Sequence, residues 1–453
     1  MNPIEDGRRR LLKAMAASTL AAARPALATA SIDQRDPATG EIPPAGADPL
    51  SGEALFRDVE HYAALGEHRT AGAADLRTSR WIAAELGAAG FDVALKPFKL
   101  SQYFNETTQL HVGEVEVPAF PHWFPRPTGK TPVRAPLALI GTDPLQGRIA
   151  YLAPQDAGPW YRVDVSQWAQ RAAAGGALAL IVAVPHPSGG IYARNAAEPY
   201  LKDGVPIPTV VVPAASDALL AKARGRGQEV SLLIDGRIDP QATAFNVIAS
   251  RNAGTGRRWV VVSTPSSGWF RCAGERGTGV ALFLGLARWI AASHPHDAIL
   301  FIASSGHELD FMGARLAFRE APPPEAVSLW LHLGASIGAR RWQVDGDRVT
   351  PMDKGHESSR LFASPQPLAQ ARQAFANVPD LHLTPSDMLS SSGGGELTHI
   401  VQDGYSAAGM VGDHRYFHTP LDLPTVTSPE LLAPYGRAFS LLITSFVGQK
   451  ASS

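Results

Sequence analysis

The segment Phe301 to Ala314, FIASSGHELDFMGA, places two side chains capable of chemistry next to each other. His307 and Glu308 follow an apolar, strand-like run that ends at two serines and a glycine. Histidine titrates near neutral pH, and carboxylates bind metals. The pair therefore indicates a metal ligand beside a proton carrier, with a polar helix start as the alternative. Residue 311 is phenylalanine, which excludes the helical zinc signature H-E-x-x-H.

A second pattern, GASIG at residues 334–338, matches the G-x-S-x-G signature of serine hydrolases and makes Ser336 an alternative nucleophile. It follows the apolar run VSLWLHL, but a nucleophile elbow also needs a helix behind the serine. The following ARRWQVDGDRVT predicts a strand and a turn instead. The stretch SSSGGGE at 390–396 lacks the lysine of a phosphate-binding loop, so we interpret it as a flexible loop beside the pocket.

The elements that would position these residues alternate between buried strands and amphipathic helices. From Asn246 onward, WVVVST, AILFIASS, VSLWLHLG and YSAAGMVG are strand candidates, and GVALFLGLARWIAAS is a helix between the first two. This order predicts an α/β fold with a mainly parallel central sheet flanked by helices on both faces. Functional groups gather at the carboxyl ends of such strands, so we expect the site after Ser263, Ser304, Leu333 and Gly412.

The remaining segments predict the domain organisation. Residues 131–240 are rich in Ala, Gly and Val and predict a smaller α/β module, inserted into a larger domain made of 53–130 and 241–450. The Pro- and Gly-rich residues 31–52 predict a linker. Residues 1–30 combine consecutive arginines, an alanine-rich apolar stretch and a small-residue cleavage site, as a twin-arginine export signal does. We therefore expect a periplasmic or secreted mature protein without a stable membrane span.

The composition narrows the class of function. The chain has 453 residues and is 45% hydrophobic, so it can form a large core. Its formal net charge of −1 argues against a nucleic acid as partner. The single cysteine, Cys272, excludes an internal disulfide and any zinc site with several cysteines.

Five segments of the chain resemble the zinc aminopeptidase family, which includes bacterial leucyl aminopeptidases, glutamate carboxypeptidase II-like proteins and glutaminyl cyclases. In chain order they are HRTAGAADLRTSRWIAAELGAAGFDV, NVIASRNAGTGRRWVVVST, CAGERGTGVALFLGLAR, FIASSGHELDFMGA and YFHTPLDLPTVT. The resemblance implies the zinc exopeptidase fold over most of the chain. The module at 131–240 resembles the protease-associated domain that is often inserted in this family.

The metal pocket of that family is only partly retained. The first histidine of the pattern would fall near Pro265 and its second aspartate near Gly334, and both are absent. The resemblance leaves Glu275, Glu308 and His418 as ligands. Such a set implies a single zinc ion with a fourth position open for water or substrate.

The resemblance also implies roles for the neighbouring residues. His307 stands where the pattern has its glutamate base, so it would carry protons in catalysis. Asp422 would orient the second ring nitrogen of His418. If ligands have been exchanged, the further candidates are His332, Asp413 and His414.

Three functions remain open at this point. The first is an exported zinc-peptidase-like hydrolase that acts on an amide, peptide or related acyl bond of a small peptide or amide-like substrate. The second is a catalytically inactive peptidase-like protein that binds a peptide or small molecule in the cleft where the family has its active site. It is open because two metal ligands and the glutamate base of the family pattern are absent. The third is a serine hydrolase that uses Ser336.

Overall fold

The structure is a computed structural model, and it describes residues 48–196, 200–254, 256–389 and 394–450. The predicted export signal at 1–30, and residues 31–47 of the predicted linker, lie outside the described residues. Among the helices of the described part, none has both the length and the apolar composition that crossing a bilayer requires.

Within the described residues, fourteen strands form one sheet in the order β15-β14-β16-β11-β9-β10-β8-β4-β5-β6-β7-β3, with β1 paired to β8 and β2 paired to β1. The separate hairpin β12-β13 completes the strands. Their bounds are β1 Asp92–Val112, β2 Val115–Val117, β3 Phe120–Pro121, β4 Val133–Leu139, β5 Ile149–Leu152, β6 Ala179–Val184, β7 Thr209–Pro213, β8 Glu229–Arg251, β9 Trp259–Pro265, β10 Ile299–Ser304, β11 Val327–Leu333, β12 Arg340–Asp345, β13 Arg348–Gly355, β14 Arg360–Ala363, β15 His382–Pro385 and β16 Ala407–Val411.

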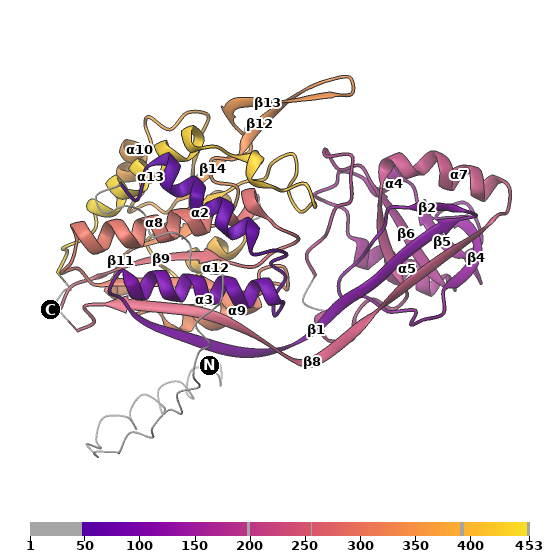
Figure 1. The fold of residues 1–453 in the computed structure, drawn as a ribbon, viewed down its shortest axis with the longest axis horizontal. Coiled ribbons are helices and arrows are strands. Elements are labelled where there is room, and N and C mark those ends of the chain that lie inside the picture. The colour runs from indigo at the N-terminus through magenta and orange to yellow at the C-terminus, as the bar shows by residue number, and fades with distance from the viewer. Residues whose placement is uncertain (1–47, 197–199, 255, 390–393, 451–453) are drawn as a thin grey trace, which may run out of the picture. The chain divides into compact units, whose positions relative to one another are not determined.

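The helices that flank these strands, together with one π-helical turn, carry several of the residues discussed below (Figure 1). Their bounds are α2 Gly52–Ala64, α3 Ala73–Ala88, α4 Pro154–Ala157, α5 Val165–Ala174, α6 Tyr200–Asp203, α7 Asp217–Gly225, the π-helical turn η2 Ala273–Gly277, α8 Thr278–Ser293, α9 Met312–Ala317, α10 Leu368–Ala374, α12 Glu396–Gln402 and α13 Pro429–Thr444.

The strands β10, β9, β11 and β16 are parallel neighbours in the middle of the sheet. Their side chains alternate between two cores, because successive residues of a strand point to opposite faces. Val260 and Val262 pack in the core that contains residues of α2, α3, α8 and α13, whereas Val261 packs in the core that contains residues of α9 and α12. The predicted α/β fold with a mainly parallel sheet between helices is thereby confirmed.

The strands β1 and β8 are 21 and 23 residues long and run side by side, paired from Asp92–Ser250 to Val112–Val230 (Figure 1). At one end β8 pairs with β10, and at its other end it pairs with β4. The strands β4, β5, β6 and β7 then form a second parallel group. This group falls within the predicted module 131–240; its assignment as a protease-associated domain stays a prediction.

Candidate active site

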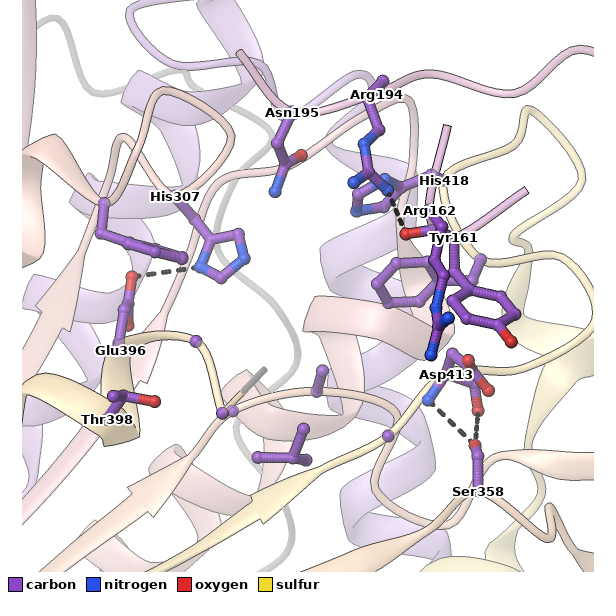
Figure 2. Close-up of a pocket in the computed structure, with 18 of the residues that line it drawn as sticks. Tyr161, Arg162, Arg194, Asn195, His307, Ser358, Glu396, Thr398, Asp413 and His418 are labelled. Atoms are coloured by element: carbon purple, nitrogen blue, oxygen red, sulfur yellow. Dashed lines mark hydrogen bonds and ion pairs between the residues drawn. The ribbon is translucent and has the colours of Figure 1, made fainter. Parts of the chain in front are cut away.

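A cavity of about 960 Å³ lies at the carboxyl ends of β10, β11 and β16. Its lining includes His307 beyond β10, Gly334 beyond β11 and Asp413 beyond β16. These strand ends are three of the four positions at which the sequence predicts functional groups. Figure 2 shows His307 and Glu396 on one side of the cavity, with Arg162, Arg194 and Asp413 on the other.

Beside the cavity, Glu275 and His418 meet, as the ligand prediction requires of this pair. Their Oε1 and Nε2 atoms are 3.0 Å apart, and both side chains are buried. The other ring nitrogen of His418, Nδ1, is 3.0 Å from the carbonyl oxygen of Ala193, which fixes the plane of the imidazole. Glu275 is carried by the π-helical turn η2, a rare element that is often found at functional sites.

The same carboxylate is also held by the guanidinium of Arg276, the next residue in η2. Nη2 of Arg276 lies 2.6 Å from Oε1 of Glu275, and both side chains are 1% exposed or less. Burial raises the pKa of Glu275, but the positive charge of Arg276, followed by that of His418, outweighs burial and brings the pKa to about 2. Glu275 is therefore a carboxylate at neutral pH, already neutralised by a cation of the protein.

Glu308 does not join this pair. Its Oε1 accepts hydrogen bonds from the backbone N–H and the hydroxyl of Thr70, both at 2.7 Å, and its Oε2 accepts one from Ser267 at 2.8 Å. Its carboxylate is fully buried, and these three hydrogen bonds connect the loop after β10 to Thr70 and Ser267. The sequence could not predict this, because Thr70 lies 238 positions away.

The predicted zinc site is consequently not assembled. Within the described residues, no three side chains among His, Cys, Asp and Glu are placed to hold a metal ion together, and this includes the predicted set Glu275, Glu308 and His418. Two donors meet where a structural or catalytic zinc needs three or four. The reason is physical: one carboxylate is paired with Arg276, and the other is saturated by hydroxyl and amide donors.

The positions of the two missing ligands contain no replacement. Pro265 ends β9 and offers no side-chain donor. At Gly334 a Cβ atom would lie 2.4 Å from the carbonyl oxygen of Met410, so an aspartate would not fit without movement of the backbone. The carbonyl oxygen of Gly334 instead accepts a hydrogen bond from Nη1 of Arg276 at 2.6 Å.

His307, which is partly exposed, forms a cluster with the buried residues Glu396 and His332. Nδ1 of His307 lies 3.1 Å from Oε1 of Glu396, and Nε2 of His332 lies 3.6 Å from Oε2 of the same carboxyl group. Nδ1 of His332 is 2.9 Å from the hydroxyl of Ser263, which itself accepts a hydrogen bond from Trp330. All three members of the cluster line the cavity.

The cluster is uncharged at neutral pH. Burial raises the pKa of Glu396 to about 8, although Arg276 opposes the shift. Burial lowers the pKa of His332 to about 3 and, together with the charge of Arg276, holds the pKa of His307 well below its usual range. The carboxyl group therefore carries the proton and the imidazoles are neutral, so this is a hydrogen-bonded pair and not a salt bridge.

The sequence did not predict Glu396, and it gave His332 only as a further candidate. The glycines that precede Glu396 indicate a loop, whereas the structure begins α12 at Glu396 itself. The sequence does contain one signal for Glu396: this glutamate follows glycines and stands in the first turn of an amphipathic segment.

Asp422 has a different partner from the predicted one. Its Oδ1 accepts from the N–H of Gly274 at 2.6 Å, and its Oδ2 accepts from the N–H of Glu275 at 3.1 Å. Oδ2 also pairs with Nε2 of His414 at 3.4 Å, while His418 is oriented by Ala193. Asp422 therefore anchors the backbone of η2 and does not orient His418.

Ser336 has one feature of a nucleophile elbow and lacks the others. Its φ of 57° is a left-handed backbone conformation in the turn that follows β11, after Gly334 and Ala335. Its hydroxyl is fully buried with no hydrogen-bond partner among the described residues, so no base activates it. The chain continues into β12 rather than into a helix. The serine hydrolase alternative has no support in this geometry.

Solved structures of other proteins resemble the fold described above. No protein-family model and no curated protein matches the sequence. Among solved structures, a zinc aminopeptidase from Bacillus subtilis aligns with a TM-score of 0.68 at 18% identity, covering 90% of this chain and 97% of that one. A peptidase precursor from Shewanella amazonensis aligns at 0.67 with 17% identity, over 89% and 97%. An aminopeptidase from Aneurinibacillus aligns at 0.62 with 15% identity, over 89% and 97%.

These similarities establish the class of fold. The chain has the α/β fold of the zinc aminopeptidases across nearly its whole described length, and the predicted resemblance is confirmed at the level of the fold. Chemistry has to be argued from the side chains of this chain, because a shared fold does not fix function.

Proposed function

We propose that this protein is a peptidase-like hydrolase that cleaves an amide, peptide or related acyl bond in the cavity described above. The observation that carries the proposal is the cluster of His307, Glu396 and His332 at the cavity wall, with the imidazole and carboxyl group of the first two 3.1 Å apart. Hydrolysis of an amide needs a group that gives a proton to the leaving amine. The aminopeptidase fold supports the same class of reaction.

In this proposal His307 and Glu396 move one proton between them. At neutral pH the carboxyl group of Glu396 holds a proton that it can donate to Nδ1 of His307. Figure 2 shows the ring of His307 turned so that its other nitrogen faces the cavity. That nitrogen gives its proton to the leaving amine as the C–N bond breaks, and Glu396 resupplies the ring. Water forms the new C–O bond at the carbonyl carbon and returns a proton to the carboxylate of Glu396.

We propose a short peptide or amide-like molecule as the substrate. A volume of about 960 Å³ is within the range of small-molecule sites, and it is too small for a folded partner. The arginines Arg162 and Arg194 on the wall opposite His307 favour a substrate with a negatively charged group at that end.

The residues present do not fit a zinc site of the predicted kind, so no step of this mechanism passes through a metal ion. Glu275 and His418 are the two donors that meet, and Glu308 is held apart from them. Chelation tests this separately: activity that survives EDTA agrees with the mechanism above, and activity lost with EDTA and regained with zinc contradicts it.

A catalytically inactive binding protein is the second candidate. The specific observation in its favour is that Glu275 and Glu308, two residues at ligand positions of the resemblance, are both engaged inside the protein, Glu275 through Oε1 and Glu308 through both carboxylate oxygens. Calorimetric titration with peptides that bind without being turned over would favour this candidate.

The proposed function is tested with a panel of fluorogenic aminoacyl and peptidyl amides. His307→Ala should reduce kcat/KM by roughly 10²- to 10⁴-fold, the usual contribution of a positioned acid or base, while the far-UV circular dichroism stays unchanged. His382→Ala, in the exposed first position of β15, is the matched control and should retain full activity. Equal activity of the two variants would reject the proposal.

We also propose that the protein acts outside the cytoplasm, on the basis of the export signal predicted in residues 1–30. Replacing both Arg8 and Arg9 by lysine should retain the protein in the cytoplasmic fraction of its host. Unchanged fractionation would reject export by the twin-arginine route.

A further inference from the structure

Arg276 is a fully buried arginine at the wall of the cavity, in the π-helical turn between the end of β9 and α8. Burial of a charged side chain is costly unless the charge is paired and hydrogen-bonded. The position of this guanidinium therefore requires an explanation in terms of what surrounds it.

The guanidinium bridges two positions that the family resemblance marks for acidic metal ligands. Its Nη2 pairs with Oε1 of Glu275 at 2.6 Å, and its Nη1 donates to the carbonyl oxygen of Gly334 at 2.6 Å. At the second position the aspartate is absent, and the close approach of Met410 leaves no room for one. The positive charge that faces Glu275 in this site is therefore a side chain of the protein, the guanidinium of Arg276.

Part of the guanidinium remains without an acceptor. Among the described residues, Nε of Arg276 has no acceptor, and Nη2 lies 2.6 Å from Oε1 of Glu275 without a hydrogen bond of good geometry. Oε2 of Glu275 also has no hydrogen-bond partner. Buried N–H groups without an acceptor are rare and costly in folded proteins. Because Arg276 lines the cavity, an oxygen atom of a bound molecule can supply the missing acceptor.

We infer that the guanidinium of Arg276 takes the place of a metal ion in this site, neutralising Glu275 and offering its free N–H groups to the carbonyl oxygen of the substrate. The part of this inference that concerns the carbonyl oxygen rests on the proposed function. The part that concerns the metal does not, since it follows from the contacts of Arg276 alone.

A guanidinium in this position disfavours a divalent cation in two ways. It occupies Oε1 of Glu275, the oxygen that also faces His418, and it places a fixed positive charge beside any ion held by that pair. A guanidinium can still polarise a carbonyl group, because preorganised donors in a water-poor site stabilise the oxyanion that forms during acyl transfer.

Metal content tests the first part. The full chain is purified without chelator, equilibrated with zinc, desalted and analysed by mass spectrometry for bound metal, alongside Glu275→Gln and His418→Ala. We expect the three proteins to retain the same zinc level. One zinc ion per chain in the wild type that is lost in both variants would overturn the inference.

Kinetics tests the second part. Arg276→Met alone leaves Glu275 buried without the charge of the guanidinium and can fail to fold, so the informative protein is the double variant Glu275→Gln with Arg276→Met, in which both charges are removed. If it melts like the wild type, its kcat/KM should be lower by about 10²- to 10³-fold, the loss typical for one oxyanion donor. A folded double variant with wild-type kcat/KM would overturn the role of Arg276.

Arg288→Met is the matched control, because Arg288 also forms ion pairs, with Asp58 and Glu85, and does not line the cavity. It should change the melting temperature but leave kcat/KM unchanged. If the wild type hydrolyses none of the amides, the proposed function has failed, and the metal measurement still decides whether Arg276 replaces an ion.

Discussion

At the scale of single residues, Glu396 has the environment most relevant to catalysis. It is 1% exposed, lies between two imidazoles, and has a pKa raised to about 8 by burial. A neutral carboxyl group inside a cavity can donate a hydrogen bond that a carboxylate cannot. This property distinguishes Glu396 from Glu275, which is equally buried but charged because of Arg276.

The raised pKa of Glu396 predicts how stability depends on pH. The pKa is about 8 in the folded chain against an ordinary value of 4.5, so the folded state binds the proton more tightly. The resulting stabilisation is complete below pH 4.5 and is lost as the pH rises through 8. The free energy of unfolding of the wild type, minus that of Glu396→Gln, should therefore fall between these pH values.

Urea denaturation of both proteins at several pH values measures this difference. Asp75, whose pKa burial also raises to about 8, is present in both proteins and cancels. A difference that stays constant with pH would show that Glu396 is charged in the folded protein.

At the scale of elements, the close packing of two strand ends determines what the site can hold. Gly334, directly after β11, lies so near the carbonyl oxygen of Met410 in β16 that a side chain there would meet it at 2.4 Å. The same glycine presents its carbonyl oxygen to Arg276. The contact between the two strands therefore both excludes an acidic ligand and accepts the guanidinium.

Gly334→Ala should accordingly destabilise the protein by roughly 1–3 kcal/mol, the usual cost of overpacking a tight contact. Gly412→Ala is the matched control beyond β16, since the nearest atoms to its added Cβ lie at an ordinary 3.5 Å. Its free energy of unfolding should change by less than about 0.5 kcal/mol. Equal effects in chemical denaturation would contradict this account of the contact.

The elements themselves were largely predictable from the sequence. Mainly apolar runs such as WVVVST and AILFIASS are buried on both faces, and they became β9 and β10 because parallel strands are covered by helices on both sides. The polar helix start considered for His307 and Glu308 was not: α9 begins only at Met312, after a turn.

The site was predictable only in part, for reasons that lie in long-range contacts. The meeting of Glu275 with His418 follows from the resemblance, and the structure contains it. Glu308 lies apart from Glu275 and His418 because Thr70 binds its carboxylate. Glu275 is neutralised because its neighbour Arg276 is buried beside it. No local pattern encodes the contact with Thr70 or the burial of Arg276. The ligand set Glu275, Glu308 and His418 stays a prediction, and the structure brings two of its members, Glu275 and His418, together.

At the scale of the whole molecule, the long strand β8 contributes to two hydrophobic cores that lie far apart along it. The first contains residues of α2, α3, α8 and α13, and the second is built largely from residues of β1, β4, β5, β6 and β7. Val247 and Ala249 of β8 pack in the first core, and Val230 and Leu232 of the same strand pack in the second. An interruption of β8 would therefore disturb both cores.

We expect the described part of the chain to unfold in a single calorimetric transition. Ile181→Ala, in the fully buried β6, removes apolar volume from the second core and should cost about 2–5 kcal/mol. It should lower the temperature of the one transition without splitting it. Two resolved heat-absorption peaks in the wild type would show that the cores unfold independently.

The double hydrogen bond between Ala193 and His418 has a consequence for how such a protein can evolve. Ala193 donates its N–H to the carbonyl oxygen of His418 and accepts at its own carbonyl from the ring, although the two residues are 225 positions apart. The segment 131–240, which contains Ala193, thus supplies part of the scaffold that orients a cavity residue. Replacing this segment by an unrelated one would remove the two hydrogen bonds that orient His418, so the segment and the site constrain each other's sequence.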